Sequence, residues 1–326
     1  MLAFLFRRSW HAVITLIVMA IVVFFAIHLI GNPVDVLARP DATPLERAQI
    51  ARELGLDQPI WVQFAVFLEN AVRGDLGVSF VYNRSAVDVI LERIPATAEL
   101  VITALILSIS IGVPLGLIAG LWADSWLGRA IMAGSTLGFS LPSFWIGLVL
   151  ILVFAVQLGW LPAGGRGMTS TFLGIESALF SYDGLKHLIL PAATLALHKA
   201  SLVIRVAQAG TREVIRQDYI RFARAKGLRQ SRILSTHVLK NILLPVITIV
   251  GLELGSMIAF AVVTETVFAY PGMGKLLIDS INRLDRPVVV AYLMLAVLIF
   301  IVINLAVDIL YAIVDPRVRL SEASGQ

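Results

Sequence analysis

The sequence has no cysteine and few charged residues. Of its 326 residues only 15% are charged, 58% are hydrophobic, and the mean hydropathy is +0.88. Soluble domains usually carry about 25% charged residues, so this chain has too few polar side chains to cover a water-exposed surface. The absence of cysteine excludes disulfides and thiolate metal sites. These shortages exclude a soluble enzyme, a disordered protein and a disulfide scaffold, and they indicate a multi-spanning membrane protein.

Motifs for catalysis and for nucleotide binding are also missing. Gly274-Lys275 is followed by Leu276 and lacks the upstream glycine of a P-loop, so the chain cannot bind ATP through a P-loop of its own. Neither G-x-S-x-G nor H-E-x-x-H occurs. The histidines are scattered, and His187 and His198 are too far apart along a helix to share one metal ion. We therefore expect no catalytic, cofactor-binding or metal site, and we do not expect an enzyme.

Apolar stretches of about 20 residues, the length that crosses a bilayer, dominate the chain. The third stretch contains Pro142 and is too long for one straight span, so we expect one long helix, kinked or broken there. The fourth contains Pro191, His198, Lys199 and Arg205 and is too polar to face lipid on all sides. We predict an all-α protein whose six transmembrane helices lie within 12–29, 100–123, 130–165, 188–209, 242–263 and 288–307.

The distribution of positive charge predicts which side of the membrane the loops face. Arg7 and Arg8 precede the first span, and the segment 205–240 holds nine Lys and Arg against two acidic residues, a net +7. With six spans both lie on the same side, which the positive-inside rule makes the cytoplasm. We therefore expect both termini in the cytoplasm. We divide the chain into 1–30 with the first span, an extracytoplasmic segment 31–95, and a five-helix core 96–326 with a cytoplasmic loop 210–241.

The segment 31–95 carries six Arg and nine acidic residues and has the pattern of a folded, helical region. Thr43-Pro44-Leu45-Glu46 is a capping box with proline at the first helical position, and Gly55 suits the end of that helix. Between Ile60 and Val72 large apolar side chains recur at helical spacing. This amphipathic helix lies on the membrane surface or caps the bundle, or it is a packed helix without a site of its own.

The basic loop has its own pattern. Ile215, Tyr219, Phe222 and Lys226 fall on one face of a short helix, and Gly227 suits its C-terminal cap. An exposed helix with an aromatic knob fits a groove in a partner protein. The alternative is a solvated basic loop that only enforces topology, and the residues alone leave both interpretations open.

Several motifs resemble one family when they are taken together and in order. Ala223-Arg224-Ala225-Lys226-Gly227-Leu228, with Asp218-Tyr219-Ile220 before it and His237 and Asn241 after it, resembles the coupling loop of ABC importer permeases of the dipeptide, oligopeptide and nickel group. The outer segment resembles that of the B-type permease of this group. The other motifs that carry the resemblance lie at 54–59, 74–77, 140–144, 160–162, 265–274 and 315–319.

The resemblance implies a permease subunit in a bacterial inner membrane that works by alternating access. The implied partners are a homologous C-type permease, two ATP-binding subunits or domains that bind the ATP, an extracytoplasmic substrate-binding protein and lipid, but no nucleic acid. The expected cargo is a di- or oligopeptide, with nickel, opines or glutathione as alternatives. The family's loop has a glutamate six residues before its glycine, where this chain has Arg221, so that contact is not carried over. The expected ATPase contacts are Asp218, Tyr219, Phe222, Ala223 and Gly227.

The segment Tyr270-Pro271-Gly272-Met273-Gly274 is a candidate gate at the outer mouth of the pathway, an assignment that comes mainly from the resemblance. Pro271 fixes its own φ, and Gly272 and Gly274 permit positive φ on either side of Met273. That chemistry suits a tight or re-entrant turn. The alternative is a plain surface turn.

Ionisable residues inside spans are costly and are candidates for function. Glu99 and Asp308 lie near span ends, where we expect snorkelling or a surface position. Glu253 is mid-span, and we expect it to form a structural ion pair with Lys199 rather than to contact substrate. In a different class of protein, a proton-driven secondary transporter, Glu253, His198 and Lys199 would form a relay. That alternative calls for inverted repeats, which the sequence does not display.

Overall fold

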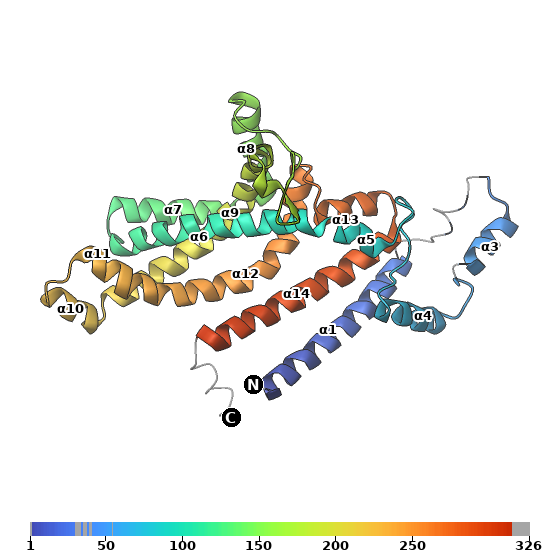
Figure 1. Cartoon of the computed structure of the whole chain (residues 1–326), viewed down its shortest axis with the longest axis horizontal. Helices are drawn as coiled ribbons and strands as arrows, with labels where there is room; N and C mark the ends of the chain where they lie inside the picture. The colour runs from blue at the N-terminus through green and yellow to red at the C-terminus, as the bar shows by residue number, and fades with distance from the viewer. Residues whose placement is uncertain (1, 30–33, 35–37, 39–40, 54, 315–326) are drawn as a thin grey trace. The chain divides into compact units, whose positions relative to one another are not determined.

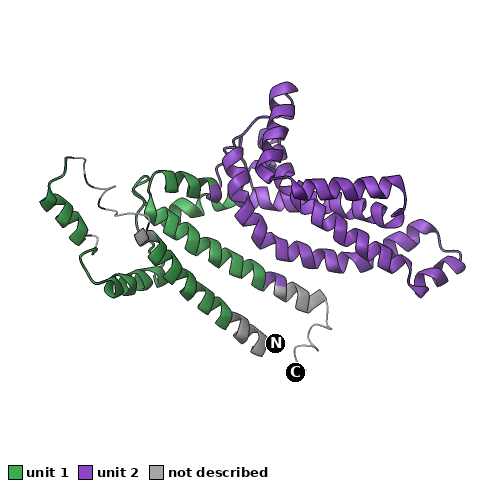
Figure 2. Ribbon diagram, turned by 180° about the vertical axis from the view of Figure 1, so that it is seen from behind, with its two compact units in different colours: residues 1–95, 275–305 green, residues 96–274, 306–326 purple. Residues whose placement is uncertain are grey.

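The computed structural model describes residues 2–29, 34, 38, 41–53 and 55–314. The C-terminal motif 315–319, Leu54 and the side chain of Asp308 lie outside the described part of the chain. The chain divides into two compact units, which Figure 2 shows in two colours. One comprises residues 1–95 with 275–305, and the other comprises 96–274 with 306–326.

The first unit holds the segment that we expect outside the membrane. The capping box is confirmed, because Thr43 N donates to Glu46 Oε2 at 2.7 Å and Glu46 N donates to Thr43 Oγ1 at 3.4 Å. Gly55 follows that helix with φ +66°, as expected. The unit's helices, with the larger parts of the last two, are α1 (Leu2–Leu29), α3 (Pro44–Glu53), α4 (Ile60–Val72), α5 (Ala86–Leu91), α13 (Met273–Asn282) and α14 (Arg286–Val314).

Two contacts order the first unit. The predicted amphipathic helix is α4, and its Phe64 and Phe67 rings lie 5.1 Å and 5.7 Å from the ring of Phe24 on α1. The fully buried carboxylate of Asp285 accepts a hydrogen bond from the hydroxyl of Ser79 and another from a backbone N–H of the turn that follows it. A turn whose backbone donors are satisfied by a buried carboxylate is held firmly. The aromatic contact with α1 packs one face of α4, and the other face of α4 is exposed.

The second unit carries most of the candidate functional residues. Its centre is α9, which packs against α7, α8 and α12 (Figure 1). The elements in chain order are α6 (Ile94–Leu121), α7 (Trp126–Ser140), α8 (Ser143–Leu150), the π-helical η1 (Ile151–Gln157), β1 (Ser170–Phe172), β2 (Ile175–Ser177), the 3₁₀ turn η2 (Ala178–Phe180), α9 (Tyr182–Ile215), α10 (Asp218–Ala225), α11 (Gln230–Arg232), the π-helical η3 (Ile233–Leu239) and α12 (Lys240–Val267).

Helix α9 tolerates polar residues because its neighbours in the chain cover it. Two-thirds of its most apolar window is buried, against about one-third in the other candidate spans. It also approaches α6 closely, where Gly112, Gly116 and Gly120 form a stripe of small residues. A Cβ at these positions would overlap, in the same order, the side chains of Val203, Ala207 and Thr211 on α9. Small residues that let backbones approach closely are typical of packed membrane helices.

The third expected span is broken rather than kinked. The helix α7 ends at Ser140, α8 begins at Ser143, and the two are bent by 105° (Figure 1). Leu141 is extended, with φ −80° and ψ 135°, as proline disfavours the helical conformation in the residue before it. The expected helical range 130–165 is also too long, because regular helix stops at Gln157. The stretch beyond it leads into the short hairpin β1–β2, which the sequence did not predict.

The structure confirms an all-α membrane protein but not the number of spans. Within the described residues, four helical stretches are long and apolar enough to cross a bilayer, and counting α7 and α8 as one bent span gives five. These five coincide with the second to sixth expected spans. The first expected span lies on α1, a helix of 28 residues that contains the apolar stretch Trp10–Ala26.

Candidate functional site

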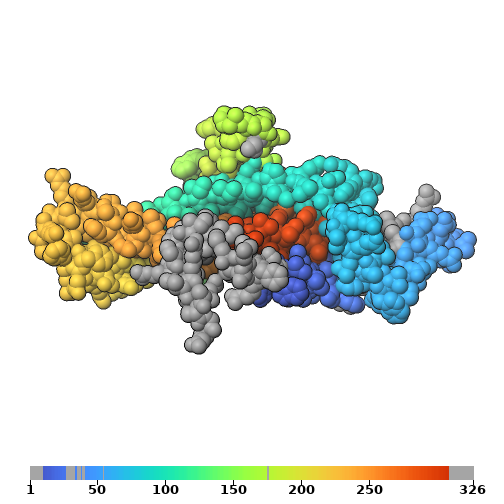
Figure 3. Space-filling model, turned by 60° about the horizontal axis from the view of Figure 1, so that its bottom comes forward, coloured from blue at the N-terminus to red at the C-terminus, as the bar shows by residue number. Residues whose placement is uncertain are grey.

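The predicted coupling helix is α10, which follows α9 after a two-residue turn. Ile220 and Ala223 of α10 are buried in an apolar cluster with Ile233, Val238 and Ile242. This cluster fixes one face of the short helix to the rest of the unit. In Figure 3 the segment, coloured yellow to orange, lies at the surface. The opposite face of α10 is therefore the one that a partner can reach.

The exposed face of α10 carries three of the predicted residues. Phe222 is the most prominent, with 63% of the residue exposed and Lys226 Nζ 4.7 Å from the centre of its ring. Tyr219 is less free, since its hydroxyl accepts a hydrogen bond from Asn241 Nδ2 at 3.2 Å. Asp218 lies in the first turn with Arg221 Nη1 3.5 Å from its carboxylate, and both side chains of this ion pair are largely exposed to solvent.

Ala223 does not fit the prediction that it contacts a partner. It is only 6% exposed, because its side chain points into the cluster around Ile233. Helical spacing explains the error, since Phe222 and Ala223 are neighbours in sequence and lie about 100° apart around the helix axis. Gly227 follows the helix with φ +74°, as the sequence predicted, and no atom lies within 4 Å of where its Cβ would be. Within this chain glycine is therefore required at position 227 by the backbone conformation and not by a crowding neighbour.

The loop 268–274 is compact and mostly buried. Tyr270 N donates to the carbonyl of Glu265 at 2.8 Å, and Met273 N donates to Thr97 Oγ1 at 2.9 Å as α13 begins. Gly272 is buried and Pro271 is partly exposed. The plain surface turn is thus excluded for this loop, which packs on α6 and α12 within the unit.

The glycines of this loop are required for a reason other than the predicted one. Neither Gly272 nor Gly274 has a positive φ, and the residue in the left-handed region is Ala269, with φ +47°. A Cβ at Gly272 would overlap the carboxylate of Glu265, and one at Gly274 would overlap the backbone of Val262. Space, not backbone freedom, therefore demands glycine at both positions.

The carboxylate of Glu265 is one buried polar group that the sequence reasoning missed. It is fully buried and accepts a hydrogen bond from Thr97 Oγ1 at 2.6 Å. Because Thr97 Oγ1 in turn accepts from Met273 N, the pair lies over the N-terminus of α13, where negative charge is favourable. The sequence signal that could have identified this group is the glutamate at the start of the motif 265–274, which follows the fifth expected span.

Glu99 is the clearest correction to the sequence analysis. It was expected at a surface, but it is only 6% exposed. Its carboxylate accepts hydrogen bonds from Arg166 Nη2 at 2.6 Å, Arg166 Nε at 3.1 Å, the Tyr270 hydroxyl at 3.1 Å and the Ala178 backbone at 3.3 Å. Four donors use all of the accepting capacity of one carboxylate. Glu99 therefore connects α6 to the segment 166–178 and to the loop that contains Tyr270. Both of these partners are far from Glu99 in the sequence.

The charges in this cluster shift the ionisation of both partners. Burial lowers the pKa of Arg166, but the hydrogen bond and the charge of Glu99 outweigh it, and the pKa lies above its ordinary value. Burial also raises the pKa of Tyr270, and the negative charge of Glu99 raises it further. Arg166 is thus held cationic and Tyr270 neutral, the two forms that donate to a carboxylate.

Lys199 and Glu253 are brought together by the structure. Lys199 Nζ contacts Glu253 Oε2 directly and lies 2.7 Å from Ser256 Oγ, which donates to the same carboxylate at 2.6 Å. The lysine is buried, whereas 29% of the glutamate side chain is exposed. The third member of the alternative relay, His198, stacks on Phe139 with ring centres 5.0 Å apart and forms no hydrogen bond with either charge among the described residues.

Within the described ranges, no three His, Cys, Asp or Glu residues lie close enough together to hold a metal ion. The arrangement instead offers a basic helix with an aromatic knob, a buried loop at α13 and charged residues along α9 and α12. These features are of the kind that transport and coupling to a partner use.

Comparisons with known proteins agree with this interpretation. Residues 112–320 match the family model "Binding-protein-dependent transport system inner membrane component", and residues 1–101 match the model for the N-terminal part of such components. The chain is 38% identical to the dipeptide transport system permease protein DppB of Alkalihalophilus pseudofirmus, over 98% of this chain and all of the relative. It is 37% identical to the glutathione transport system permease protein GsiC of Escherichia coli K12, over 98% of this chain and 99% of the relative.

A solved structure shows the same fold. The inward-facing methionine ABC transporter MetNI contains a chain that matches with a TM-score of 0.55 at 17% identity, over 70% of this chain and 96% of the other. The family models cover most of the sequence, and the two relatives cover nearly all of it. The chain therefore belongs to the inner membrane components of binding-protein-dependent transport systems, as an ABC importer permease of the peptide and nickel group.

Proposed function

We propose that this chain is the B-type permease of an importer for di- and oligopeptides and forms half of the translocation pathway. The observation that carries the proposal is the similarity to a dipeptide permease along the whole of both chains. Six spans, with α1 as the first, place both termini and the basic segment in the cytoplasm under the positive-inside rule. The segment 31–95 is then extracytoplasmic, where a substrate-binding protein docks.

The partners follow from the membership of the family. A homologous C-type permease supplies the other half of the pathway, and two ATP-binding subunits bind and hydrolyse ATP, because this chain has no P-loop. The ATPases contact α10 through Phe222 and Tyr219. Closing of the ATPases on ATP moves α10, and the buried face of α10 passes that motion to α9 and α12. The result is alternation between inward-open and outward-open states.

Glutathione is the second candidate cargo, and the similarity to a glutathione permease at nearly the same identity favours it. Glutathione is itself a peptide with free carboxylates, so the two candidates share their chemistry. Nickel and opines stay alternatives that the resemblance to the peptide and nickel group implies. The proton-driven secondary transporter is ruled out as an alternative, because the family depends on a binding protein and an ABC importer architecture.

The test is reconstitution of the complete importer, with both permeases, the ATPases and the binding protein, in liposomes loaded with ATP. We expect uptake of a labelled dipeptide that requires both ATP and the binding protein. Competition by unlabelled glutathione distinguishes the two cargoes. Peptide uptake that persists without ATP but collapses with the proton gradient would contradict the proposal.

A further inference from the structure

A continuous row of aromatic and charged side chains crosses α7, α9 and α12. Arg205 Cζ lies 4.6 Å from the ring centre of Phe139, which stacks on His198 at 5.0 Å. The His198 ring lies 6.0 Å from Phe260, and Lys199 Nζ lies 4.9 Å from the centre of the Phe260 ring. The row ends at Glu253, which Lys199 contacts. We call these six residues, Arg205, Phe139, His198, Phe260, Lys199 and Glu253, the aromatic–cationic row.

The row is partly open rather than sealed in a core. Phe139 is 46% exposed, Phe260 is 45% exposed, and the Glu253 side chain is 29% exposed. Charged groups in membrane proteins face the bundle interior or a water-filled cavity, because contact with hydrocarbon is costly. An open face with a glutamate and an aromatic-stacked arginine is therefore not a lipid-facing surface.

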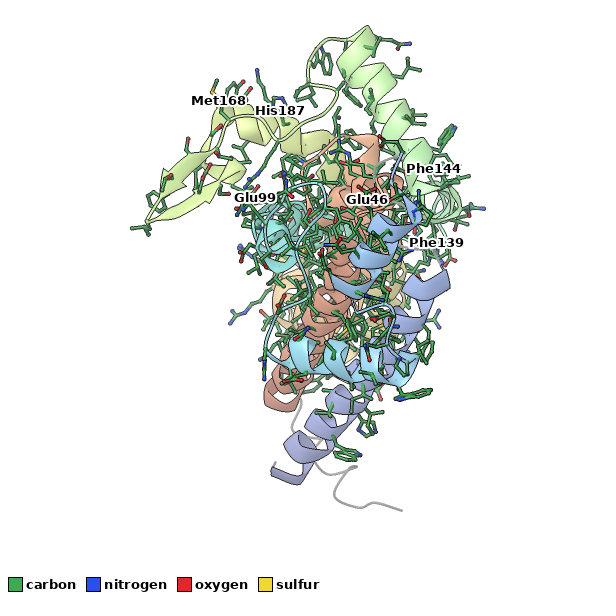
Figure 4. All side chains as sticks on the ribbon, turned by 90° about the vertical axis from the view of Figure 1, so that its right-hand side faces the viewer. Glu46, Glu99, Phe139, Phe144, Met168 and His187 are labelled. Carbon is green, nitrogen blue, oxygen red and sulfur yellow. The ribbon has the colours of Figure 1, made fainter. Side chains whose placement is uncertain are left out.

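The backbone next to the row leads to the same conclusion. Phe139 is the last residue but one of α7, about 20 Å from the start of that helix, and the 105° break follows it. Phe144, just beyond the break, appears on the same side as Phe139 in Figure 4. Interrupted backbone at membrane depth is tolerated only against protein or water. The break and the row therefore both face protein or water rather than lipid.

Two atoms of the row still lack partners. Arg205 Nε and His198 Nδ1 are buried and have no hydrogen-bond partner within the part of the chain that the structure describes. Buried donors and acceptors are nearly always paired, so each of these indicates a missing partner. The formal charges of Arg205, Lys199 and Glu253 sum to +1, which favours an anion. A guanidinium with unused donors, held against an aromatic ring, is suited to binding a carboxylate.

We propose that the aromatic–cationic row is a transit subsite for the C-terminal carboxylate of the peptide, with Arg205 as its charge partner. The proposal rests on the function proposed above and goes further, because it assigns a recognition role to the permease itself. Arg205 and Lys199 are six residues apart on α9, a separation of about 9 Å along the axis. Lys199 is already paired with Glu253, whereas Arg205 Nε has no hydrogen-bond partner among the described residues, so Arg205 is the cation of the row that is left for a substrate.

The experiment compares two cargoes that differ only in this group. The complete importer is reconstituted in liposomes loaded with ATP, and uptake of labelled dialanine and of dialanine C-terminal amide is measured at saturating binding protein. We expect Arg205→Gln to lower the maximal rate for dialanine about tenfold, the effect of losing one charge-assisted hydrogen bond, and to leave the amide within about twofold. Arg205→Lys should retain an intermediate rate. Arg212→Gln, an exposed arginine on the same helix, is the matched control and should change neither.

A second measurement covers the case in which the binding protein rejects the amide. Excess unlabelled dialanine or its amide is loaded inside the liposomes, where it meets the permeases but not the binding protein. Internal dialanine should slow uptake by the wild type, internal amide should not, and Arg205→Gln should abolish the difference. Equal loss for both cargoes would assign Arg205 to a lipid phosphate or to a structural role. Loss of assembled complex would assign it to an acidic residue of the other permease. Either result, or no change, overturns the proposal.

The two proposals fail in different ways. A wild-type importer that carries no peptide contradicts the proposed function. A wild-type importer that carries peptide, with Arg205→Gln indistinguishable from it for both cargoes, contradicts the subsite alone.

Discussion

Two polar clusters within the second unit each contain an arginine, a glutamate and an aromatic side chain, and they have opposite designs. The cluster around Glu99 is closed, since Arg166, Tyr270 and a backbone N–H occupy every accepting position of a buried carboxylate. The row from Arg205 to Glu253 is open, since its rings are half-exposed and two of its buried polar atoms are unpaired among the described residues.

The difference separates a cluster that stabilises the fold from a cluster that can bind a ligand. A polar network whose members are all satisfied rigidifies its surroundings and offers nothing to a ligand. A network that keeps unused donors on an accessible face can exchange partners as cargo passes. The same distinction applies to α10, where Ile220 is buried to fix the helix and Phe222 is exposed to be bound. Solvent exposure and hydrogen-bond pairing, more than residue type, distinguish the residues that stabilise the fold from the residues that can bind a partner.

The largest effect is expected where the closed cluster is opened. Glu99→Gln leaves Arg166 with its charge and no counter-ion, which costs about 3–5 kcal/mol for a buried pair. We expect a clearly lower melting temperature of the purified importer. The control is Glu92→Gln, which removes an exposed pair with Arg84 and should leave the melting temperature unchanged. Equal melting of the two variants would show that burial does not distinguish these pairs.

Removing one charge from the open row should cost less. A single uncompensated charge in a span costs about 2.5–3.5 kcal/mol on insertion scales, so Lys199→Met or Glu253→Gln alone should reduce the amount of assembled complex. The double variant should recover part of it, because the two charges no longer need each other. A double-mutant cycle on assembled complex measures the coupling. Additive losses would mean that the ion pair is not structural, and a proton relay would instead leave assembly normal.

The gate loop tests whether glycine is needed for space. Gly272→Ala must displace the buried carboxylate of Glu265, and Gly274→Ala meets the backbone of Val262. Overpacking of this kind costs about 1–3 kcal/mol, so we expect reduced uptake with binding-protein docking intact. Gly134→Ala on α7, where no atom lies within 4 Å of the new Cβ, is the control. Normal uptake by both loop variants at normal membrane levels would reduce this loop to a connector.

The smallest effect on stability is expected at the most exposed residue. Phe222→Ala should change the stability of the subunit by no more than about 0.5 kcal/mol but should weaken substrate-stimulated ATPase activity of the importer. Gly227→Trp should also weaken that stimulation, and because it strains a backbone at φ +74° it should cost about 1–3 kcal/mol of stability as well. Ile220→Ala, two residues earlier and buried, should instead destabilise the subunit by about 2–5 kcal/mol. Full stimulation in both Phe222→Ala and Gly227→Trp would exclude α10 as the coupling element.

Local patterns in the sequence predicted the elements well. The capping box at Thr43, the limits of α4, the end of α10 at Gly227 and the interruption at Pro142 all depend on residues within about one helical turn of each other. The length of each apolar stretch is also a local property of the sequence, and it predicted the helices that can cross a membrane. These features were available before any packing was known.

What the sequence by itself determined is the class of protein, its helices and the residues that carry charge into the membrane. Only the tertiary structure decided how those charges are used. Glu99 meets Arg166 and Tyr270 across 67 and 171 residues, and Gly272 is glycine because of Glu265 on the preceding helix. Spacing along the chain reports on neighbours one turn away, whereas burial and pairing depend on which helix faces pack together. The role of a polar residue within a membrane protein is therefore settled by packing.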